Sequence, residues 1–309
     1  MTCILQLGPL TERFNRSLAA EHEVLRIWEQ DADALLDRQA HRIEVVVTSA
    51  RFGCSAVLIE RLPNLRAIIS FGVGYDSIDV AAARARGISV SNTPDVLNDC
   101  VADLAFGLII DCARQMSRAD RFVRANEWLS GGLSLATSVS GKRLGIVGLG
   151  RIGEAVAKRS SGFDMQVRYH NRRPVDDSAY GYEPSLIELA RWSDFLVLTC
   201  PGGASTRNLI DRDVLDALGP NGILINVSRG SVVDEPALVE ALVEGRLGGA
   251  GLDVYAEEPK VPPALFELPN VVLLPHIGSA TAETRLAMEE LLFANLRAFL
   301  ERGEVLTAV

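Results

Sequence analysis

Residues 141–153 read GKRLGIVGLGRIG, an apolar segment that runs into three glycines spaced G-x-G-x-x-G. The apolar part has the composition of a buried parallel strand, and residues 151–161 after it have helical spacing. In such a strand–turn–helix, Gly148 permits the tight turn, Gly150 lets the backbone approach a pyrophosphate, and Gly153 lets helix and strand pack closely. The alternatives are a plain turn in an empty α/β layer and a site for adenosyl-methionine.

The start of the helix after this loop is the expected anion site. The amides of Gly150, Arg151 and Ile152 stand at its N-terminus, where free N–H groups and the helix dipole attract negative charge. Leu149 completes the loop between the first two glycines. We therefore predict that these residues bind a dinucleotide cofactor.

Outward from the loop, apolar strands alternate with helical patterns in both directions, which implies parallel βαβ units. Toward the C-terminus the predicted strands are RLGIVG, QVRYH, FLVLTC, GILINVS, GAGLDVY and VVLLPH, with helices over 151–161, 184–192, 212–218 and 235–244. Toward the N-terminus they are CILQLG, EVLRIW, EVVVTS, RAIISF and ISVSN, with helices over segments such as 33–40 and 78–86.

Three further segments complete this assignment. A helix of about four turns is predicted to begin near Asn98, after the TPD of residues 93–95 breaks the first series. Residues 118–140 have weak periodicity and look like an excursion between units. A last long helix is predicted over 281–301.

The predicted fold class is α/β, with two doubly wound parallel-sheet domains around a cleft. The first, flavodoxin-like domain has only five candidate strands, so the last helix is expected to pack back onto it. Its predicted extent is 1–97 plus 279–309. The second is a dinucleotide-binding, Rossmann-type domain over 98–278.

Composition excludes several classes of protein. The 309 residues are 48% hydrophobic and 23% charged, an ordinary globular balance, and the net charge of -9 argues against binding nucleic acid. No apolar run is long enough for a membrane span, and the N-terminus lacks the features of a signal peptide. The five cysteines form no CxxC pair, which favours reduced thiols in a cytoplasmic protein, and no metal site is expected.

The second strand after the loop ends in YHNRRP, residues 169–174. In dinucleotide-binding folds this place usually carries an acid that bonds the ribose of NAD. Here Asn171 removes the repulsion of a 2′-phosphate, and Arg172 and Arg173 supply positive charge. The sequence thus predicts NADP(H) as the cofactor, with NAD(H) less favoured. The alternative is a solvated corner.

Three chemically active side chains follow later strands of the same domain. Arg229 follows the fourth strand, Glu258 the fifth and His276 the sixth. In an open parallel sheet, ligands bind beyond the carboxyl ends of the strands, so all three are expected to face one crevice. Taken singly, each has a structural alternative, a hydrogen-bonded core histidine or a solvated charge.

With these residues and several longer stretches, the chain resembles the D-isomer-specific 2-hydroxyacid dehydrogenases over nearly its whole length. Within that family it is most similar to NADPH-dependent glyoxylate, hydroxypyruvate and hydroxyphenylpyruvate reductases. The matching stretches are SFGVGYDSID, NTPDVLNDCVADLAFGLI, GKRLGIVGLGRIG, DALGPNGILINVSRGSVVDEPALVEALVEGRLGGAGLDVYAEEP and NVVLLPHIGSATAETR.

The resemblance implies a role for each of the three side chains. His276 would be the acid/base that protonates the carbonyl oxygen of a 2-keto acid when a hydride reaches its α-carbon. Glu258 would hold the other ring nitrogen and stabilise the imidazolium. Arg229 would bind the substrate carboxylate and contact the cofactor, since its planar fork fits a carboxylate.

The resemblance also implies binding groups elsewhere. The backbone amides of Val73 and Gly74 would receive the substrate carboxylate in the first domain, unless GVG is a plain turn. Asp253 would bond the nicotinamide carboxamide, or merely cap a strand end. Val227 and Ser228 would line the cofactor.

The expected function is therefore NADPH-preferring reduction of small 2-keto acids, glyoxylate and hydroxypyruvate, to D-2-hydroxy acids. The alternatives are an NAD-linked biosynthetic dehydrogenase of the same family and a nucleotide-sensing co-repressor-like binding protein. The resemblance suggests a homodimer in which Trp128 either reaches the partner's active site or packs locally. Arg51 and Phe52 either contact the variable end of the substrate or form a solvated loop.

Overall fold

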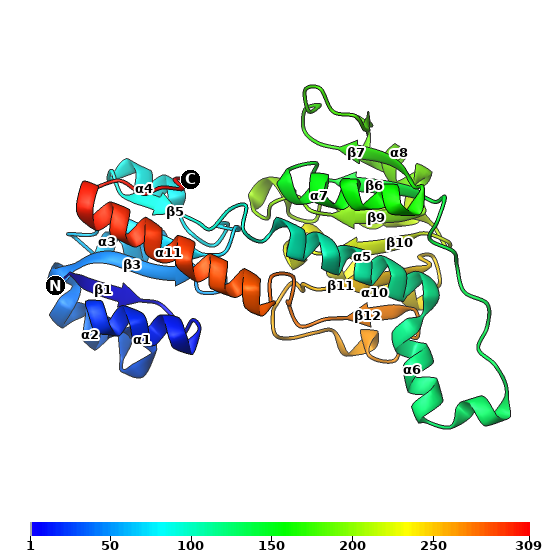
Figure 1. Ribbon diagram of the computed structural model, residues 1–309, viewed down its shortest axis with the longest axis horizontal. Helices are drawn as coiled ribbons and strands as arrows, with labels where there is room; N and C mark the ends of the chain where they lie inside the picture. Colours follow the sequence, from blue (N-terminus) through cyan, green and yellow to red (C-terminus); the bar gives the residue numbers. More distant parts are fainter. Residues whose placement is uncertain (1) are drawn as a thin grey trace. The chain divides into compact units, whose positions relative to one another are not determined.

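The computed structural model describes residues 2–309, which form two compact units. Unit 1 combines the chain up to Leu97 with Thr281–Val309, and unit 2 is the continuous segment Asn98–Ala280. Figure 1 labels the helices and strands of both units. Among the helices of residues 2–309, none combines the length and apolar composition that a membrane span requires.

Unit 1 is built on a parallel sheet with the order β2-β1-β3-β4-β5, the flavodoxin-like order. Its strands are β1 (Cys3–Gln6), β2 (Glu23–Arg26), β3 (Ile43–Ser49), β4 (Ala67–Phe71) and β5 (Ser89–Ser91). All five correspond to predicted strands. The second is shorter than EVLRIW suggests, because Ile27–Glu29 turns into a 3-10 helix, η1.

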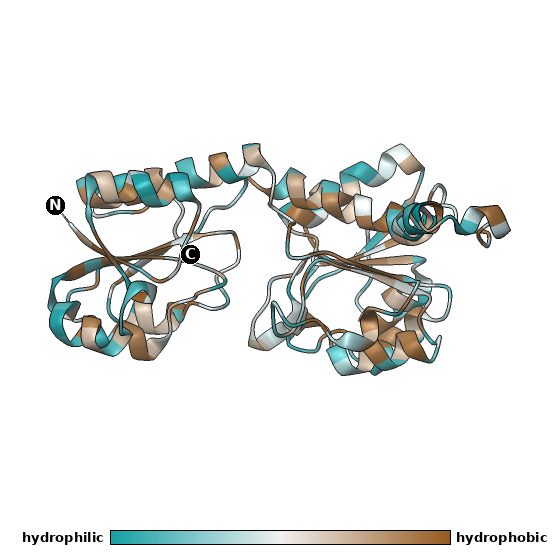
Figure 2. Cartoon of the chain, turned by 90° about the horizontal axis from the view of Figure 1, so that it is seen from below, coloured by the Kyte–Doolittle hydropathy of each residue, from teal (hydrophilic) through white to brown (hydrophobic). Residues whose placement is uncertain are grey.

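Helices cover both faces of this sheet (Figure 2). They are α1 (Glu12–Glu21), α2 (Ala32–Gln39), α3 (Ala56–Arg61), α4 (Val80–Ala85) and α11 (Ala282–Arg302), with the 3-10 turn η2 (Ala40–Arg42). Side chains of α2, α3 and α4 share one core with Leu5, Val46 and Ile68 of the strands. On the other side α11 packs on β4, and Phe293 of α11 lies 4.7 Å from Phe14 of α1, ring centre to ring centre.

Unit 2 is built on a parallel sheet with the order β12-β11-β10-β9-β6-β7-β8. Its strands are β6 (Arg143–Val147), β7 (Gln166–His170), β8 (Gly181–Tyr182), β9 (Phe195–Leu198), β10 (Ile223–Asn226), β11 (Gly249–Leu252) and β12 (Val271–Leu273). Read from β8, this is the doubly wound order of dinucleotide-binding domains. Six of the strands were predicted, and the two-residue β8 was not. The predicted fold class, two doubly wound parallel-sheet α/β domains, is confirmed.

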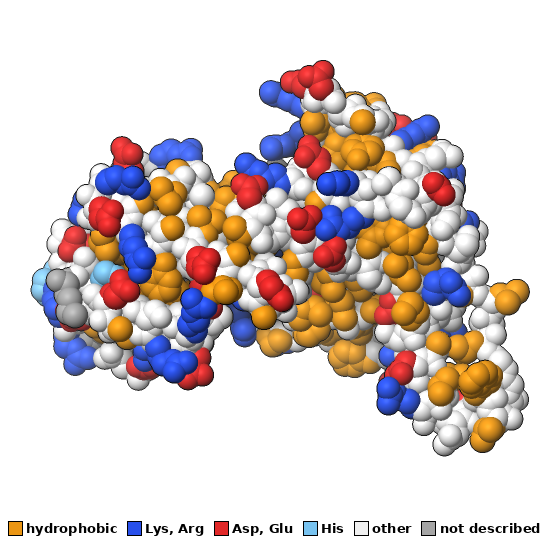
Figure 3. Space-filling view, in the orientation of Figure 1, with side chains coloured by type: hydrophobic (Ala, Val, Ile, Leu, Met, Phe, Trp, Pro, Cys, Tyr) orange, Lys and Arg blue, Asp and Glu red, His pale blue; other side chains and the backbone are white. Residues whose placement is uncertain are grey.

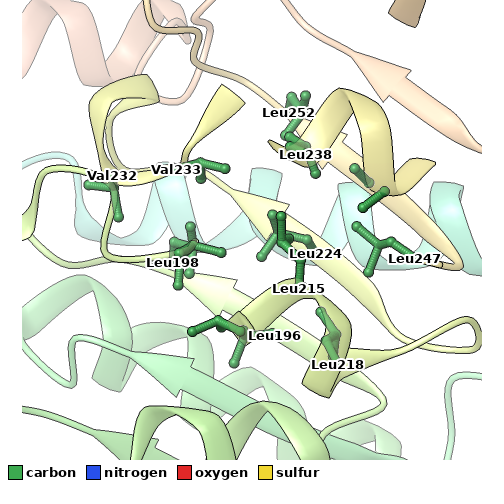
Figure 4. Close-up of a cluster of buried hydrophobic side chains, with 14 of the residues drawn as sticks. Leu196, Leu198, Leu215, Leu218, Leu224, Val232, Val233, Leu238, Leu247 and Leu252 are labelled. Atoms are coloured by element: carbon green, nitrogen blue, oxygen red, sulfur yellow. The ribbon is translucent and has the colours of Figure 1, made fainter. Parts of the chain in front are cut away.

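The helices of unit 2 cover both faces of its sheet, except α6, which lies on a protruding arm formed by residues 116–140. They are α5 (Asn98–Arg114), α6 (Met116–Arg124), α7 (Arg151–Ser160), α8 (Leu186–Trp192), α9 (Arg212–Leu218) and α10 (Glu235–Val243), with 3-10 turns η3 (Glu127–Ser130), η4 (Ser161–Phe163), η5 (Ala204–Thr206), η6 (Gly230–Val232) and η7 (Pro263–Leu265). The helices α5 and α7 pack together, and α5 contacts β10, β11 and β12. The core beneath α8, α9 and α10 is a cluster of leucines and valines from helices and strands (Figure 4).

The excursion over residues 118–140 contains more regular structure than its sequence predicts. Met116–Arg124 forms α6, which has no buried residue, and η3 follows it. The prediction of weak helical periodicity is wrong for α6, which has a pronounced apolar side although none of its residues is buried. Hydrophobic side chains instead gather on the surface of this arm, lower right in Figure 3.

Candidate active site

The three glycines after β6 each meet a different steric requirement. Gly148 has φ +102°, and a Cβ on it would lie 2.5 Å from the amide nitrogen of Cys200. A Cβ on Gly153 would overlap the carbonyl oxygen of Gly148. Beside Gly150, in contrast, no heavy atom lies within 4 Å of the place of a Cβ. The first and third glycines are thus required by packing, and the second keeps open the space that a ligand group needs.

The helix after this loop starts without a side-chain cap. Most α-helices of the chain begin at a Ser, Thr or Asp whose side chain accepts an amide of the first turn, as Asp211 does for α9. Gly150 caps α7 and offers no such acceptor. The amide of Gly150 itself donates to the carbonyl oxygen of Gly148 at 2.8 Å, although the sequence predicts it among the anion-binding amides. The helix start without a side-chain cap and the open space at Gly150 fit the pyrophosphate of a dinucleotide.

Asn171, just past the end of β7, bonds to the glycine loop itself. Its Oδ1 accepts the amide of Leu149 at 2.7 Å, and its Nδ2 donates to the carbonyl oxygen of Leu149 at 3.3 Å. The backbone agrees, since the amide of Gly148 donates to the carbonyl oxygen of His170 at 3.0 Å. Asn171 thus holds the conformation of the glycine loop. It also occupies the place after the second strand where dinucleotide-binding domains usually carry an acidic residue.

The two arginines that follow are exposed to solvent. Within residues 2–309, Arg172 and Arg173 form no ion pair or hydrogen bond with a protein group. Many other arginines are paired, as Arg168 is with Glu183. Two unpaired guanidinium groups thus closely follow β7 and are available to bind an anion.

His276 and Glu258 are hydrogen-bonded. His276 Nδ1 lies 2.7 Å from Glu258 Oε2, and the other carboxylate oxygen of Glu258 accepts the amide of Tyr255 at 3.2 Å. The His276 side chain is 45% exposed, which leaves Nε2 available to a substrate. Burial raises the pKa of Glu258, but the bond to His276, the charges of His276 and Arg229 and the Tyr255 amide outweigh it, so this pKa is lowered overall. Glu258 is therefore held as a carboxylate facing the imidazole.

The loop that carries Arg229 packs against the loop that carries Glu258. A Cβ on Gly230 would overlap the carbonyl group of Tyr255, so only glycine allows the two backbones to lie this close. Arg229 donates from Nη1 to the carbonyl oxygen of Ser228 at 2.7 Å, and its charge acts on Glu258. The structure thus brings the arginine and the Glu258–His276 pair together at neighbouring strand ends.

Asp253 supports the loop of the histidine. It is 1% exposed, and its two carboxylate oxygens accept the amides of Ile277 at 2.7 Å and Gly278 at 2.8 Å. Burial raises its pKa, and these two amide bonds partly offset the rise. His276 itself has φ +55°, an unfavourable conformation for a residue with a side chain, and the Asp253 bonds help to hold it. Asp253 thus bonds to the backbone of the His276 loop, and its contact with the nicotinamide carboxamide stays a prediction.

Two residues that the sequence did not indicate organise the strand ends. Asn226, buried at the end of β10, accepts both the amide and the hydroxyl of Ser228 and donates to the carbonyl oxygen of Arg229 at 3.0 Å. Val227 is buried in the same turn. Thr199, after β9, donates to the carbonyl oxygen of Gly148 at 2.7 Å. A polar residue that ends an apolar strand, such as Asn226 in ILIN, is the only sequence signal for this role.

The remaining candidates lie in unit 1 or on the arm. Val73 and Gly74 follow β4, in the turn Gly72–Val73–Gly74. Arg51 and Phe52 are exposed, and the ring of Phe52 covers Gly8 so closely that a Cβ there would overlap it. Trp128 is 68% exposed, which does not fit local packing, one of the two alternatives considered for it.

The carboxyl edge of the unit 2 sheet therefore carries an ordered row of groups. Asn171 stands after β7, the glycine loop after β6, Arg229 after β10, Glu258 after β11 and His276 after β12, in the order of the strands. An anion site at one end and an acid/base pair beside an arginine at the other define a dinucleotide-binding domain of the dehydrogenase class.

Comparison with known proteins identifies the family. Residues 106–278 match the model of the D-isomer specific 2-hydroxyacid dehydrogenase, NAD binding domain. The chain is 47% identical to a glyoxylate/hydroxypyruvate reductase A of Arabidopsis thaliana, over 99% of this chain and 98% of the relative. It is 48% identical to a hydroxyphenylpyruvate reductase of Plectranthus scutellarioides, with the same coverage.

Among solved structures, an NADPH-dependent glyoxylate/hydroxypyruvate reductase from Sinorhizobium meliloti, in complex with NADP and malonate, superposes with a TM-score of 0.94. The two proteins share 43% sequence identity, and the match covers 100% of this chain and 96% of the solved one. The chain belongs to the D-isomer specific 2-hydroxyacid dehydrogenase family. The resemblance stated from the sequence is thereby confirmed.

Proposed function

We propose that this chain reduces small 2-keto acids, glyoxylate and hydroxypyruvate among them, to D-2-hydroxy acids, with NADPH as the preferred reductant. The observation that carries the proposal is the 2.7 Å bond between His276 Nδ1 and Glu258 Oε2, beside Arg229. The relatives at 47% and 48% identity over almost the whole chain are a glyoxylate/hydroxypyruvate reductase and a hydroxyphenylpyruvate reductase, which supports it.

The chemistry adds a hydride and a proton across the keto group. Bound NADPH supplies the hydride to the keto carbon. His276 donates the proton from Nε2 to the carbonyl oxygen, while Glu258 accepts the bond from Nδ1, orients the ring and stabilises the imidazolium. Arg229 binds the substrate carboxylate and draws charge from the keto oxygen through its planar fork.

The two domains divide the binding task. Residues 98–278 hold the cofactor, through the 148–153 loop, Val227, Ser228 and Asp253. Residues 1–97 with 279–309 present the substrate, whose carboxylate accepts from the amides of Val73 and Gly74. The open space at Gly150 and the uncapped start of α7 support the first assignment.

The preference for NADPH rests on the turn after β7. Asn171 carries no charge that would repel a 2′-phosphate, and Arg172 and Arg173 are exposed and unpaired within the described residues. NADH lacks the phosphate that these arginines bind. It is therefore accepted with lower efficiency.

Steady-state kinetics tests the proposal. The purified protein is assayed with glyoxylate, hydroxypyruvate, hydroxyphenylpyruvate and 3-phosphohydroxypyruvate, each with NADPH and NADH, by loss of the reduced nicotinamide absorbance. Higher kcat/KM for the first two acids with NADPH is the expected result. A preference for NADH and the phosphorylated acid would indicate a biosynthetic dehydrogenase. Cofactor binding without turnover of any acid would indicate a co-repressor-like binding protein.

The same proposal includes a homodimer formed through the arm and a cytoplasmic location. The five cysteines are free thiols, as in proteins of a reducing compartment, which supports the cytoplasmic location.

The homodimer is argued from the arm, residues 116–140. It exposes a set of large apolar side chains, which are Met116, Val123, Trp128, Leu129 and Leu135. A second copy of this chain would bury them. The molar mass of a Trp128→Asp, Leu129→Asp double variant, measured by light scattering, should be that of a monomer. Val57→Asp, which changes an exposed apolar residue of unit 1, is the control and should stay dimeric. A dimeric double variant, or an unmodified protein that is already monomeric, would refute the arm interface.

A further inference from the structure

The turn Gly72–Val73–Gly74 begins where β4 ends, and Thr93 holds its first residue. Gly72 has φ +121°. Its amide donates to Thr93 Oγ1 at 3.0 Å, and its carbonyl oxygen accepts the amide of Thr93 at 2.9 Å. Because β4 and β5 are paired in parallel, residues just past their ends are neighbours. The entry to the turn is therefore fixed by two bonds from one buried residue.

Asn92 fixes the next peptide unit. Its Nδ2 donates to the carbonyl oxygen of Val73 at 2.8 Å, and the residue is only 6% exposed. In a trans peptide the C=O and the following N–H point in opposite directions. With the Val73 carbonyl directed at Asn92, the amide of Gly74 is directed away from it. In residues 2–309 neither the Val73 nor the Gly74 amide donates to a protein acceptor.

Asn92 is itself held from α11 and the C-terminal segment. Its carbonyl oxygen accepts Thr307 Oγ1 at 2.6 Å, and its amide donates to the carbonyl oxygen of Thr307 at 3.4 Å. Asn295, fully buried on α11, accepts the Thr307 amide at 3.0 Å and donates to Thr307 Oγ1 at 3.0 Å. A continuous set of hydrogen bonds thus runs from α11 to the turn and leaves the Asn92 side chain little freedom.

We propose that Asn92 is a positioning residue for the substrate: by holding the Val73 carbonyl, it presents the Gly74 amide, at the other end of the same peptide unit, to the carboxylate of the 2-keto acid. The Val73 amide belongs to the preceding peptide unit, whose Gly72 carbonyl is held by the Thr93 amide. This inference rests on the proposed function. A side-chain amide is required because the partner is a carbonyl oxygen, to which only a donor can bond. The bond also polarises the peptide, which strengthens the N–H group at its other end.

The test is Asn92→Asp, which keeps the shape but replaces the donor with an acceptor that repels the Val73 carbonyl. In the NADPH-loaded enzyme, KM for glyoxylate and Kd for oxamate, a carboxylate inhibitor, should both rise about tenfold or more, the range for one charge-assisted hydrogen bond. Kd for NADPH should stay within about twofold. Asn64→Asp is the matched control, because Asn64 Nδ2 likewise donates to a backbone carbonyl of unit 1, that of His41 at 2.7 Å.

Each other outcome decides against the proposal. Unchanged KM and oxamate binding, an effect confined to kcat or to NADPH binding, or an equal effect in Asn64→Asp would each overturn it. If Asn92→Asp does not fold, Thr93→Val takes its place. This variant removes the acceptor of the Gly72 amide and keeps the side-chain shape, and it should raise KM for glyoxylate in the same way. A normal KM in Thr93→Val would also overturn the proposal. If the unmodified protein reduces no 2-keto acid, the proposed function itself fails, a result distinct from these.

Discussion

Replacing Arg172 and Arg173 together with alanine should convert a cofactor preference into near indifference. Both side chains are exposed, and neither is paired within the described residues, so their removal breaks no internal contact. A hydrogen bond to a charged group contributes about 1.5–3 kcal/mol. One phosphate contact therefore raises kcat/KM for NADPH roughly tenfold to a hundredfold. Because solvent screens exposed charges, we expect the two arginines together to contribute close to the lower end of this range, and not the sum of two full contacts.

The assay is kcat/KM for NADPH and for NADH at saturating glyoxylate, at low and at high salt. The unmodified enzyme should favour NADPH by about tenfold or more, and added salt should reduce this ratio because the contacts are exposed. The double variant should lose the preference through KM for NADPH, with NADH kinetics unchanged. Arg84→Ala, which removes an exposed arginine from α4 of unit 1, is the control. Equal efficiencies with both cofactors in the unmodified enzyme would refute the reasoning.

Four further predictions concern unit 2. His276→Asn should lower kcat by about a hundredfold or more and leave the Kd of NADPH within a few fold, and near-normal turnover would remove His276 from the mechanism. Arg229→Lys should raise KM for the keto acid although the charge is kept, because the bidentate fork is lost; unchanged kinetics would contradict the carboxylate role. Because the pKa of Glu258 is lowered, its carboxylate stabilises the fold fully above the ordinary glutamate pKa, and this stabilisation is lost as the pH falls from there through the lowered pKa of the folded state. Over that pH range the unfolding free energy of the unmodified protein, measured in urea, should fall relative to that of Glu258→Gln. A difference between the two proteins that does not change with pH would argue against the lowered pKa. Gly230→Ala should cost several kcal/mol in the same experiment, whereas Gly107→Ala on the exposed face of α5 should be neutral or stabilising.

Much of the fold follows from the sequence because buried parallel strands leave apolar runs that are easy to find. FLVLTC and GILINVS lie at the centre of the unit 2 sheet and were predicted without difficulty. Elements that bury little leave no such pattern. β8 has only two residues, neither of them buried, so it was not found. α6 was missed although it has a pronounced apolar side; none of its residues is buried, and the glycine and serine cluster after it suggested an excursion.

The candidate site shows the same division. Arg229, Glu258 and His276 could be grouped because parallel strands place their carboxyl ends along one edge. The partners of these residues could not be predicted in the same way. The bond of Asn171 to Leu149 joins positions 22 residues apart and depends on the exact turn of the glycine loop. The need for glycine at position 230 is visible only once the backbone of Tyr255 is in place.

The discontinuity of unit 1 also sets an order of events during synthesis. Unit 2 is one continuous stretch, so it can fold as soon as Ala280 has left the ribosome. The sheet of unit 1 must wait for α11, which packs on β4, although its strands are made first. At about 5–20 residues per second, the time between the synthesis of the last strand of unit 1 and that of α11 is on the order of ten seconds or more. During that time the face of β4 that α11 later covers is open to solvent and to chaperones, and the domain that starts the chain is the last to be completed.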